Sequence, residues 1–161
     1  MAARRVLCPG SFDPISLGHL DIITRAHQLF GSVVVGVGTH TQKNYLFGDE
    51  RVELVRGAVA DMDGIEVVQI DGLLVDFCRE NDIQAVVKGL RFGADFDFEV
   101  QMAHMNHGLT GLETILLPAA REHITLSSTL LRTVMKLGGD VTDYVPANVA
   151  RAIAKRGWLR P

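Results

Sequence analysis

The residues best suited to chemistry begin at position 10, where the sequence G-S-F-D-P-I-S-L-G-H follows a short apolar stretch. Gly10 leaves room for a phosphate to approach the backbone, and Ser11 adds a hydroxyl and an amide donor. His19 stands where a helix is expected to begin, and the free N–H groups of a helix start bind anions. This run therefore predicts a strand, a turn and a helix start that hold a phosphate between them. The alternative is a plain strand–turn–helix connection with a surface histidine.

The spacing of these ten residues resembles the G-[ST]-F-D-x-x-x-x-G-H signature of the nucleotidyltransferase superfamily. Members of that superfamily join the α-phosphate of a nucleoside triphosphate to a small acceptor. Every fixed position of the signature is present here. Many members have His-x-Gly-His at its end, whereas this chain has Ser16 at the first histidine position, as is common in one branch of the superfamily.

Length and composition limit the classes of protein to which the chain can belong. The 161 residues fit one domain, so we predict a single nucleotidyltransferase domain over residues 1–161. A formal net charge of -3 provides no general attraction for nucleic acid or an anionic membrane. Cys8 and Cys78 have no C-x-x-C spacing, and the sequence shows no secretory signal or membrane span. We expect a cytoplasmic protein with reduced thiols, in which Cys8 is an inert apolar group.

Apolar runs alternate with helical patterns along the chain. Strands are predicted from residue 6 and at 33–38, 65–70, 85–87 and 114–117. Helices are predicted at 17–30, at 49–60 with Asp49 as N-cap, at 73–81, at 96–108, from 125 and from Pro146. This alternation predicts a doubly wound, Rossmann-like α/β fold with a five-stranded parallel sheet. Such sheets bind ligands at the carboxyl ends of their strands.

Several side chains from distant parts of the chain fall at that carboxyl edge. They are Ser11, His19, Lys43, Lys88, Arg91 and Ser128. Taken singly, the cations are ordinary solvated surface groups and the hydroxyl is an ordinary helix cap. Their convergence on one edge predicts instead a single pocket for polyanionic ligands.

The predicted helix at 96–108 combines an acidic start with a broad apolar face. The apolar residues are Phe96, Val100, Met102, Ala103 and Met105. The two methionines are expected to contact the core or another subunit rather than a ligand. His104 and His107 are three residues apart on the same helix, but no third ligand is close in sequence, so no protein metal site is predicted.

Later motifs narrow the resemblance. The sequence K-G-L-R covers residues 88–91, D-F-D-F-E-V-Q-M-A-H-M-N covers 95–106, and S-S-T covers 127–129. Together they resemble the phosphopantetheine adenylyltransferases over nearly the whole chain. The middle block is the specific one, because it distinguishes that branch from the mononucleotide adenylyltransferases and the glycerol-phosphate cytidylyltransferases.

This resemblance implies transfer of AMP from ATP to 4′-phosphopantetheine, giving dephospho-CoA and pyrophosphate, with Mg2+ on the triphosphate. The residues that it implies to be catalytic are His19, Lys43 and Arg91. Those implied to hold the acceptor are Ser11, Lys43, Leu74 and Lys88. Those implied to contact ATP are Ser11, Phe12, His19, Gly89, Leu90, Arg91, Glu99, His123, Ile124, Thr125, Leu126, Ser127, Ser128 and Thr129. The resemblance also implies a homohexamer that CoA inhibits.

Three positions depart from the family pattern. Ser11 stands where threonine is frequent, Lys88 where arginine is frequent, and His123 where tryptophan or tyrosine is frequent. Lysine at 88 offers a point charge instead of the two-pronged geometry of a guanidinium. Two alternatives stay open at this stage: an adenylyltransferase for another phosphorylated acceptor, and a nucleotide-sensing module that performs no chemistry.

Overall fold

Strands and helices alternate along most of the chain, as the sequence predicted. The computed structural model describes residues 4–39 and 44–158. Its first nine elements are β1 (Arg4–Gly10), α1 (Leu17–Phe30), β2 (Gly31–Gly38), α2 (Glu50–Ala58), β3 (Ile65–Ile70), α3 (Leu74–Glu80), β4 (Ala85–Leu90), α4 (Gly93–Thr110) and β5 (Glu113–Pro118). The 3-10 turn η1 (Arg121–His123), α5 (Ser128–Lys136), the 3-10 turn η2 (Thr142–Tyr144) and α6 (Ala147–Lys155) follow.

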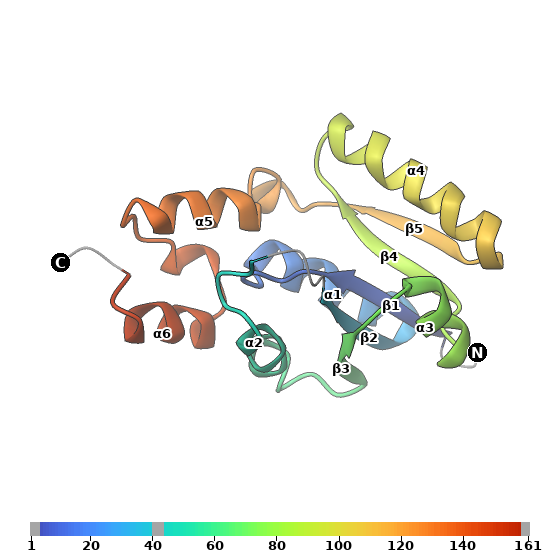
Figure 1. Ribbon diagram of the computed structural model, residues 1–161, viewed down its shortest axis with the longest axis horizontal. Helices are drawn as coiled ribbons and strands as arrows, with labels where there is room; N and C mark the ends of the chain where they lie inside the picture. Colours follow the sequence, from blue (N-terminus) through green and yellow to red (C-terminus); the bar gives the residue numbers. More distant parts are fainter. Residues whose placement is uncertain (1–3, 40–43, 159–161) are drawn as a thin grey trace.

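The five strands form one sheet in the order β3-β2-β1-β4-β5, and every neighbouring pair is parallel (Figure 1). This arrangement confirms the predicted doubly wound α/β fold. The chain builds one half of the sheet outward from β1 and then crosses to build the other half outward from β4. A crevice therefore opens between the carboxyl ends of β1 and β4, where this class of sheet binds its ligands.

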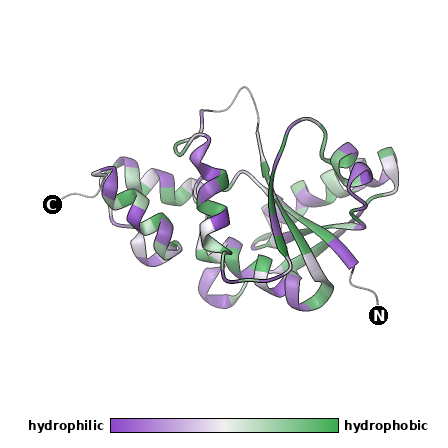
Figure 2. Ribbon diagram, turned by 90° about the horizontal axis from the view of Figure 1, so that it is seen from below, coloured by the Kyte–Doolittle hydropathy of each residue, from purple (hydrophilic) through white to green (hydrophobic). Residues whose placement is uncertain are grey.

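Both faces of the sheet are buried against helices. Side chains of one alternating set, such as Val6, Val33 and Val87, pack in a large apolar cluster with residues of α1, α2, α5 and α6. The other set, such as Leu7 and Val34, packs in a smaller cluster with α3. Figure 2 shows these apolar strands in the middle of the molecule. None of the described helices is long and apolar enough to cross a membrane.

Helix α4 is an exception, because it buries none of its residues. It contacts α3, β4 and β5 at one end of the sheet, as Figure 1 shows. Its exposed apolar side chains are Phe96, Phe98, Met102, Met105 and Leu109. Within the single chain the two methionines are therefore not core residues, and their contact with another subunit stays a prediction.

Several element boundaries differ from the prediction for identifiable reasons. Asp49 precedes α2 but has a helical backbone and no side-chain capping bond, so it does not act as the expected N-cap. Strand β4 continues past Val87 through Leu90, because its last residues pair with β5. Helix α5 also begins later than residue 125, where its start was predicted. Ser127 is its N-cap, and the Ser127 hydroxyl oxygen accepts a hydrogen bond from the Leu130 N–H at 3.1 Å.

Candidate active site

A cavity of about 420 Å³ lies at the carboxyl edge of the sheet, where the chain switches from one half to the other. Its walls come from β1 and the following turn, α1, β4, the start of α4, the segment after β5 and α5. The predicted site residues that line it are Ser11, Phe12, His19, Lys88, Gly89, Arg91, Glu99, His123, Leu126, Ser127, Ser128 and Thr129. The structure therefore brings these distant motifs, including His19 and Arg91, to one pocket.

Some predicted site residues do not line this cavity. Leu90 pairs with the end of β5, and Ile124 and Thr125 are likewise absent from the cavity wall. Leu74 begins α3 and packs with the smaller apolar cluster on the other face of the sheet. Lys43 lies outside the described residues, so its expected role stays a prediction.

The turn after β1 has a constrained backbone. A Cβ atom at Gly10 would lie 3.0 Å from the ring of Phe12, so a glycine is needed there. Phe12 itself has φ 48°, a left-handed conformation that residues with side chains rarely adopt. Its buried ring meets the imidazole of His19 edge-on, with the ring centres 5.1 Å apart. Backbone and ring packing thus bring the turn directly against the histidine.

Asp13 of the same turn is an anchor and not a reacting group. Its carboxylate is buried and accepts hydrogen bonds from the backbone N–H groups of Leu46 and Phe47, both at 2.9 Å. These two bonds attach the turn to the segment that leads into α2. Because a buried carboxylate needs such partners, the aspartate of the signature is explained by folding alone.

His19 is oriented by the start of its own helix. The N–H of Ser16 donates to Nδ1 of His19 at 3.1 Å, and the Ser16 hydroxyl oxygen accepts from the His19 N–H at 3.3 Å. This reciprocal pair is a capping box, with histidine in the place usually held by glutamate. Since Nδ1 accepts, the neutral ring carries its proton at Nε2.

The surroundings of His19 keep its ring uncharged. Burial, together with the positive charges of Lys88 and Arg91, lowers the pKa of His19 from its ordinary 6.5 to about 4. The imidazole is therefore neutral near pH 7 and presents an N–H donor without a charge. This is the state required to hydrogen-bond an oxygen on which negative charge develops.

Two cations on the cavity wall are held by carboxylates. Nζ of Lys88 lies 3.2 Å from Oε1 of Glu99. Arg91 binds Asp95 with both arms, from Nε at 2.9 Å and from Nη2 at 3.0 Å, and its Nη1 donates to the Leu126 carbonyl at 3.2 Å. Partial burial raises the pKa of Asp95, but the bonds and the charge of Arg91 outweigh this and leave the pKa below its usual 3.8. The two ion pairs hold the charged groups of Lys88 and Arg91 in place on the cavity wall.

The start of α5 holds the turn from the opposite side. Ser128 donates its hydroxyl proton to the Pro14 carbonyl at 2.8 Å, and Nη1 of Arg132 donates to the Asp13 carbonyl at 2.9 Å. Residues 127–129, at the start of this nine-residue helix, line the same cavity. An anionic ligand in the cavity would therefore meet hydroxyls, amides and a helix dipole on this wall.

Sequence reasoning missed several residues that the cavity wall contains. Ser16, Asp95 and Arg132 line it and orient its other groups. Each had a signal in the sequence: Ser16 stands in the first motif, Asp95 begins the block at 95–106, and Arg132 follows Ser128 by four residues on the same helix face. Cys8 also lines the cavity, but burial raises the pKa of its thiol to about 12 despite the nearby Lys88 charge. Burial and the raised pKa agree with the expectation that Cys8 is inert, and its reactivity stays a prediction.

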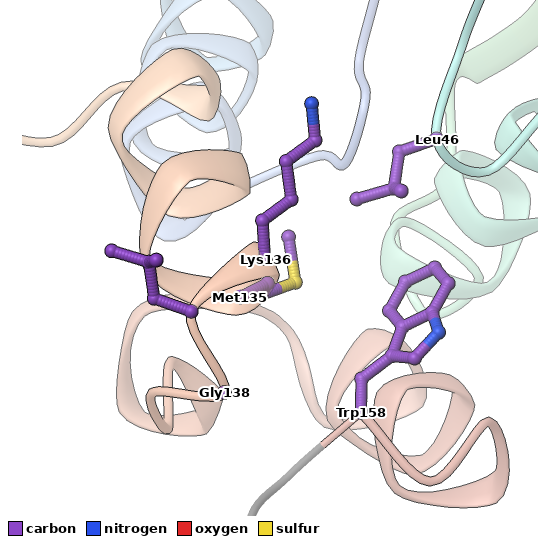
Figure 3. A pocket seen from close by; sticks show the side chains of 6 residues that line it. Leu46, Met135, Lys136, Gly138 and Trp158 are labelled. Atoms are coloured by element: carbon purple, nitrogen blue, oxygen red, sulfur yellow. The ribbon is translucent and has the colours of Figure 1, made fainter.

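A second cavity, of about 410 Å³, lies between the end of α5 and the chain beyond α6. Figure 3 shows Leu46, Met135 and the indole of Trp158 around it, with the Lys136 side chain extended along one wall. None of the predicted site residues lines it. Chemistry-bearing side chains from separate motifs meet in the first cavity instead.

A parallel sheet of this order, with a glycine-rich turn, a helix-start histidine and cations at its switch point, defines a nucleotidyltransferase. In agreement, residues 7–134 match the family model for cytidylyltransferase-like proteins. The chain is 55% identical to the phosphopantetheine adenylyltransferase of Cutibacterium acnes, over 91% of this chain and 94% of that protein. It is 49% identical to that of Pseudarthrobacter chlorophenolicus, over 93% and 92% respectively, and 48% identical to that of Streptomyces coelicolor, over 95% and 97%. The chain belongs to the phosphopantetheine adenylyltransferase family.

Proposed function

We propose that this protein transfers the AMP group of ATP to 4′-phosphopantetheine, forming dephospho-CoA and pyrophosphate. The observation that carries the proposal is the single cavity in which the neutral His19 donor stands beside the cations Lys88 and Arg91. Such a cavity suits two polyanions that must approach each other. The relatives reported above are named for this transfer, and they cover almost the whole chain.

The reaction needs no covalent intermediate with the protein. A phosphate oxygen of the acceptor attacks the α-phosphorus of ATP, a new P–O bond forms, and the bond to the β-phosphate breaks to release pyrophosphate. Because the nucleophile is already an anion, the protein has to position the reactants and stabilise charge. Lys88, Arg91 and, outside the described residues, Lys43 would offset the repulsion between them. The Nε2–H of His19 would donate to an α-phosphate oxygen as its charge grows.

We assign the two substrates to different parts of the cavity wall. The nucleotide and its phosphates would contact the turn after β1, Arg91 and the segment 123–129 with the helix start behind it. The acceptor phosphate would lie near Ser11 and Lys88, with Leu74 lining the channel for the pantetheine arm. Mg2+ would enter with ATP, because both wall carboxylates, Asp95 and Glu99, are already engaged by cations.

The proposal includes assembly and regulation. We include a cytoplasmic homohexamer on the resemblance of the sequence to the family. Association between chains is supported by the exposed apolar face of α4, which a single chain does not cover. Inhibition by CoA is supported by chemistry, because CoA contains both the phosphopantetheine and the adenosine portions of the product. It would therefore compete for the same cavity.

A pyrophosphate-release assay with purified protein, ATP and Mg2+ tests the activity. We expect release with 4′-phosphopantetheine and little release with nicotinamide mononucleotide or glycerol phosphate. Release with one of the latter acceptors alone would assign the protein to the adenylyltransferases for another phosphorylated acceptor. Calorimetric ATP binding without product from any acceptor would favour a nucleotide-sensing module.

A further inference from the structure

Arg51 of α2 is a buried cation that the reaction described above does not use. Its side chain is 2% exposed, and among the described residues no carboxylate forms an ion pair with it. The guanidinium instead donates to three backbone carbonyls: Nε to Gly48 at 2.8 Å, and Nη1 to Ser11 at 2.6 Å and to Gly38 at 3.0 Å. Its Cζ lies 3.5 Å from the ring centre of Tyr45. Burial of a charge without a counter-charge is costly, and these hydrogen bonds compensate part of that cost.

The bond to Ser11 fixes the orientation of one peptide group. The Ser11 carbonyl and the Phe12 N–H belong to the same planar trans peptide and therefore point in opposite directions. Because Arg51 of α2 binds the carbonyl, the N–H of the same peptide points away from Arg51, and both Ser11 and Phe12 line the cavity. Within the described residues this N–H has no hydrogen-bond acceptor. A backbone donor without a partner in a residue of the cavity wall is suited to an anionic ligand.

The same peptide could easily turn another way without this bond. Phe12 has φ 48°, which a residue with a side chain keeps only when its surroundings impose it. The next carbonyls of the turn are also held from outside, that of Asp13 by Arg132 and that of Pro14 by Ser128. The turn is thus held by three side chains from two other helices, and Arg51 is the one nearest to the strand end.

We propose that Arg51 is a positioning residue that turns the Ser11–Phe12 peptide so that the Phe12 N–H donates to a phosphate of bound ATP, a contact that strengthens in the transition state. This inference rests on the proposed adenylyl transfer. Arg51 touches no substrate itself and acts through the backbone of the turn. Because the Phe12 ring lies edge-on to His19, the same bond also holds the imidazole in its place.

Kinetics of Arg51→Met and Arg51→Lys test the role, with Arg56→Met as the matched control. Arg56 lies on the same helix, is exposed and pairs only with Glu53 in the described part of the chain. A misplaced reacting group typically costs about 100-fold, so we expect Arg51→Met to lower kcat by about 100-fold. The KM for ATP should change by less than about threefold, since most nucleotide contacts remain. Arg56→Met should match the wild type.

The lysine variant separates charge from geometry. It keeps the cation but lacks the planar fork that serves three carbonyls, so we expect a kcat loss of about tenfold. Should Arg51→Met fail to fold, as judged by circular dichroism and thermal melting, Arg51→Lys carries the test. Wild-type kcat in a folded variant at position 51 would overturn the proposal.

A second readout follows the Phe12 amide directly. In protein labelled with ¹⁵N-phenylalanine, a non-hydrolysable ATP analogue should shift the Phe12 amide resonance, which is assigned by its loss in Phe12→Leu. We expect this shift in the wild type and in Arg56→Met. It should be absent in folded Arg51→Met and smaller than in the wild type in Arg51→Lys. An equal shift in the folded position-51 variants would overturn the inference. This experiment uses no acceptor, so it separates a failure of the inference from a failure of the proposed phosphopantetheine activity.

Discussion

The Nδ1 atom of His19 is occupied by the Ser16 N–H, which leaves Nε2–H as the only ring donor for a ligand. A charged imidazolium would attract phosphates more strongly, but it would bind the ground state and the transition state alike. A neutral donor aimed at one oxygen favours the state in which that oxygen gains charge. The depressed pKa of His19 therefore fits a role in the chemical step more than a role in substrate capture.

Replacement of His19 by alanine tests this role. Loss of one such donor typically costs about 100- to 1000-fold in rate, and we expect kcat to fall by at least about 100-fold. ATP affinity, measured by calorimetry, should change much less, because Arg91 and the helix start of α5 remain in place. Turnover close to wild type would contradict the assignment of His19.

The protonation state of His19 can be measured by an NMR titration. Its folded pKa of about 4 lies below the ordinary 6.5, so the ring should stay neutral from pH 8 down to about pH 5. Between these two pKa values the unfolded chain binds more protons than the folded one. The stability linked to His19 is thus complete above pH 6.5 and is lost as the pH falls through about 4. The imidazole signals of His19 are identified by their absence in the spectrum of His19→Gln. Titration of these signals near pH 6.5 would refute this expectation.

The sequence identified candidate site residues that belong to motifs with a fixed spacing. It did not identify the residues that hold the site by binding backbone groups. Ser11, His19 and Arg91 stand in recognisable motifs, and the structure brings them to one cavity. Arg51 and Arg132 bind carbonyl oxygens, which every residue provides, so no pattern in the sequence indicates their partners. Which backbone groups lie within reach of a guanidinium is known only after the chain has folded.

At the level of elements, α1 was predicted with both its ends because both have local chemical causes. Ser16 caps its first turn, and Gly31 ends it with a left-handed φ of 80°. The end of β4 and the start of α4 have no such local cause. Pairing with β5 extends β4 through Lys88 and Gly89, and Phe92 at the N-cap position of α4 makes no side-chain capping bond. Tertiary pairing, which a local pattern does not contain, decides these boundaries.

Replacement of Ser16 by alanine tests the capping of α1. The variant loses the oxygen that accepts from the His19 N–H, and a lost N-cap costs about 1 kcal/mol of unfolding free energy. Ser32→Ala is the matched control, since among the described residues the Ser32 hydroxyl forms no hydrogen bond and Ser32 lies in strand β2. Urea denaturation followed by circular dichroism compares the three proteins. Equal stability of Ser16→Ala and Ser32→Ala would show that the capping box does not stabilise α1.

At the level of the whole molecule, the order of the sheet explains why the site could be predicted at all. The two halves meet at β1 and β4, so motifs more than 70 residues apart in sequence are brought to one crevice, as Ser11 and Lys88 illustrate. The alternation of strands and helices in the sequence predicted a parallel sheet. A parallel sheet of this kind in turn predicted a ligand-binding crevice at the carboxyl ends of its strands. Assembly did not follow in the same way, because an apolar helix face is compatible with burial by the same chain or by another.

The apolar stripe on α4 provides a test of whether another chain covers this helix. Phe98, Met102, Met105 and Leu109 recur at helical spacing and are 61%, 43%, 60% and 57% exposed. Soluble chains rarely leave such a stripe in water, so we expect light scattering to give the mass of six chains for the wild type. Met105→Glu should give a smaller species, because it places a charge in the apolar contact, while α4 buries no residue that the change would disturb.

Leu29→Glu serves as the control for this last prediction, since Leu29 is 63% exposed but lies on α1, away from the stripe. It should keep the mass of the wild type. Circular dichroism must first show that both variants are folded, so that a smaller mass reports lost association and not unfolding. A wild-type protein with the mass of one chain, or an unchanged mass in folded Met105→Glu, would mean that the stripe is not the contact between subunits. In that case the exposed face of α4 would require a different physical explanation, because its own sheet leaves it uncovered.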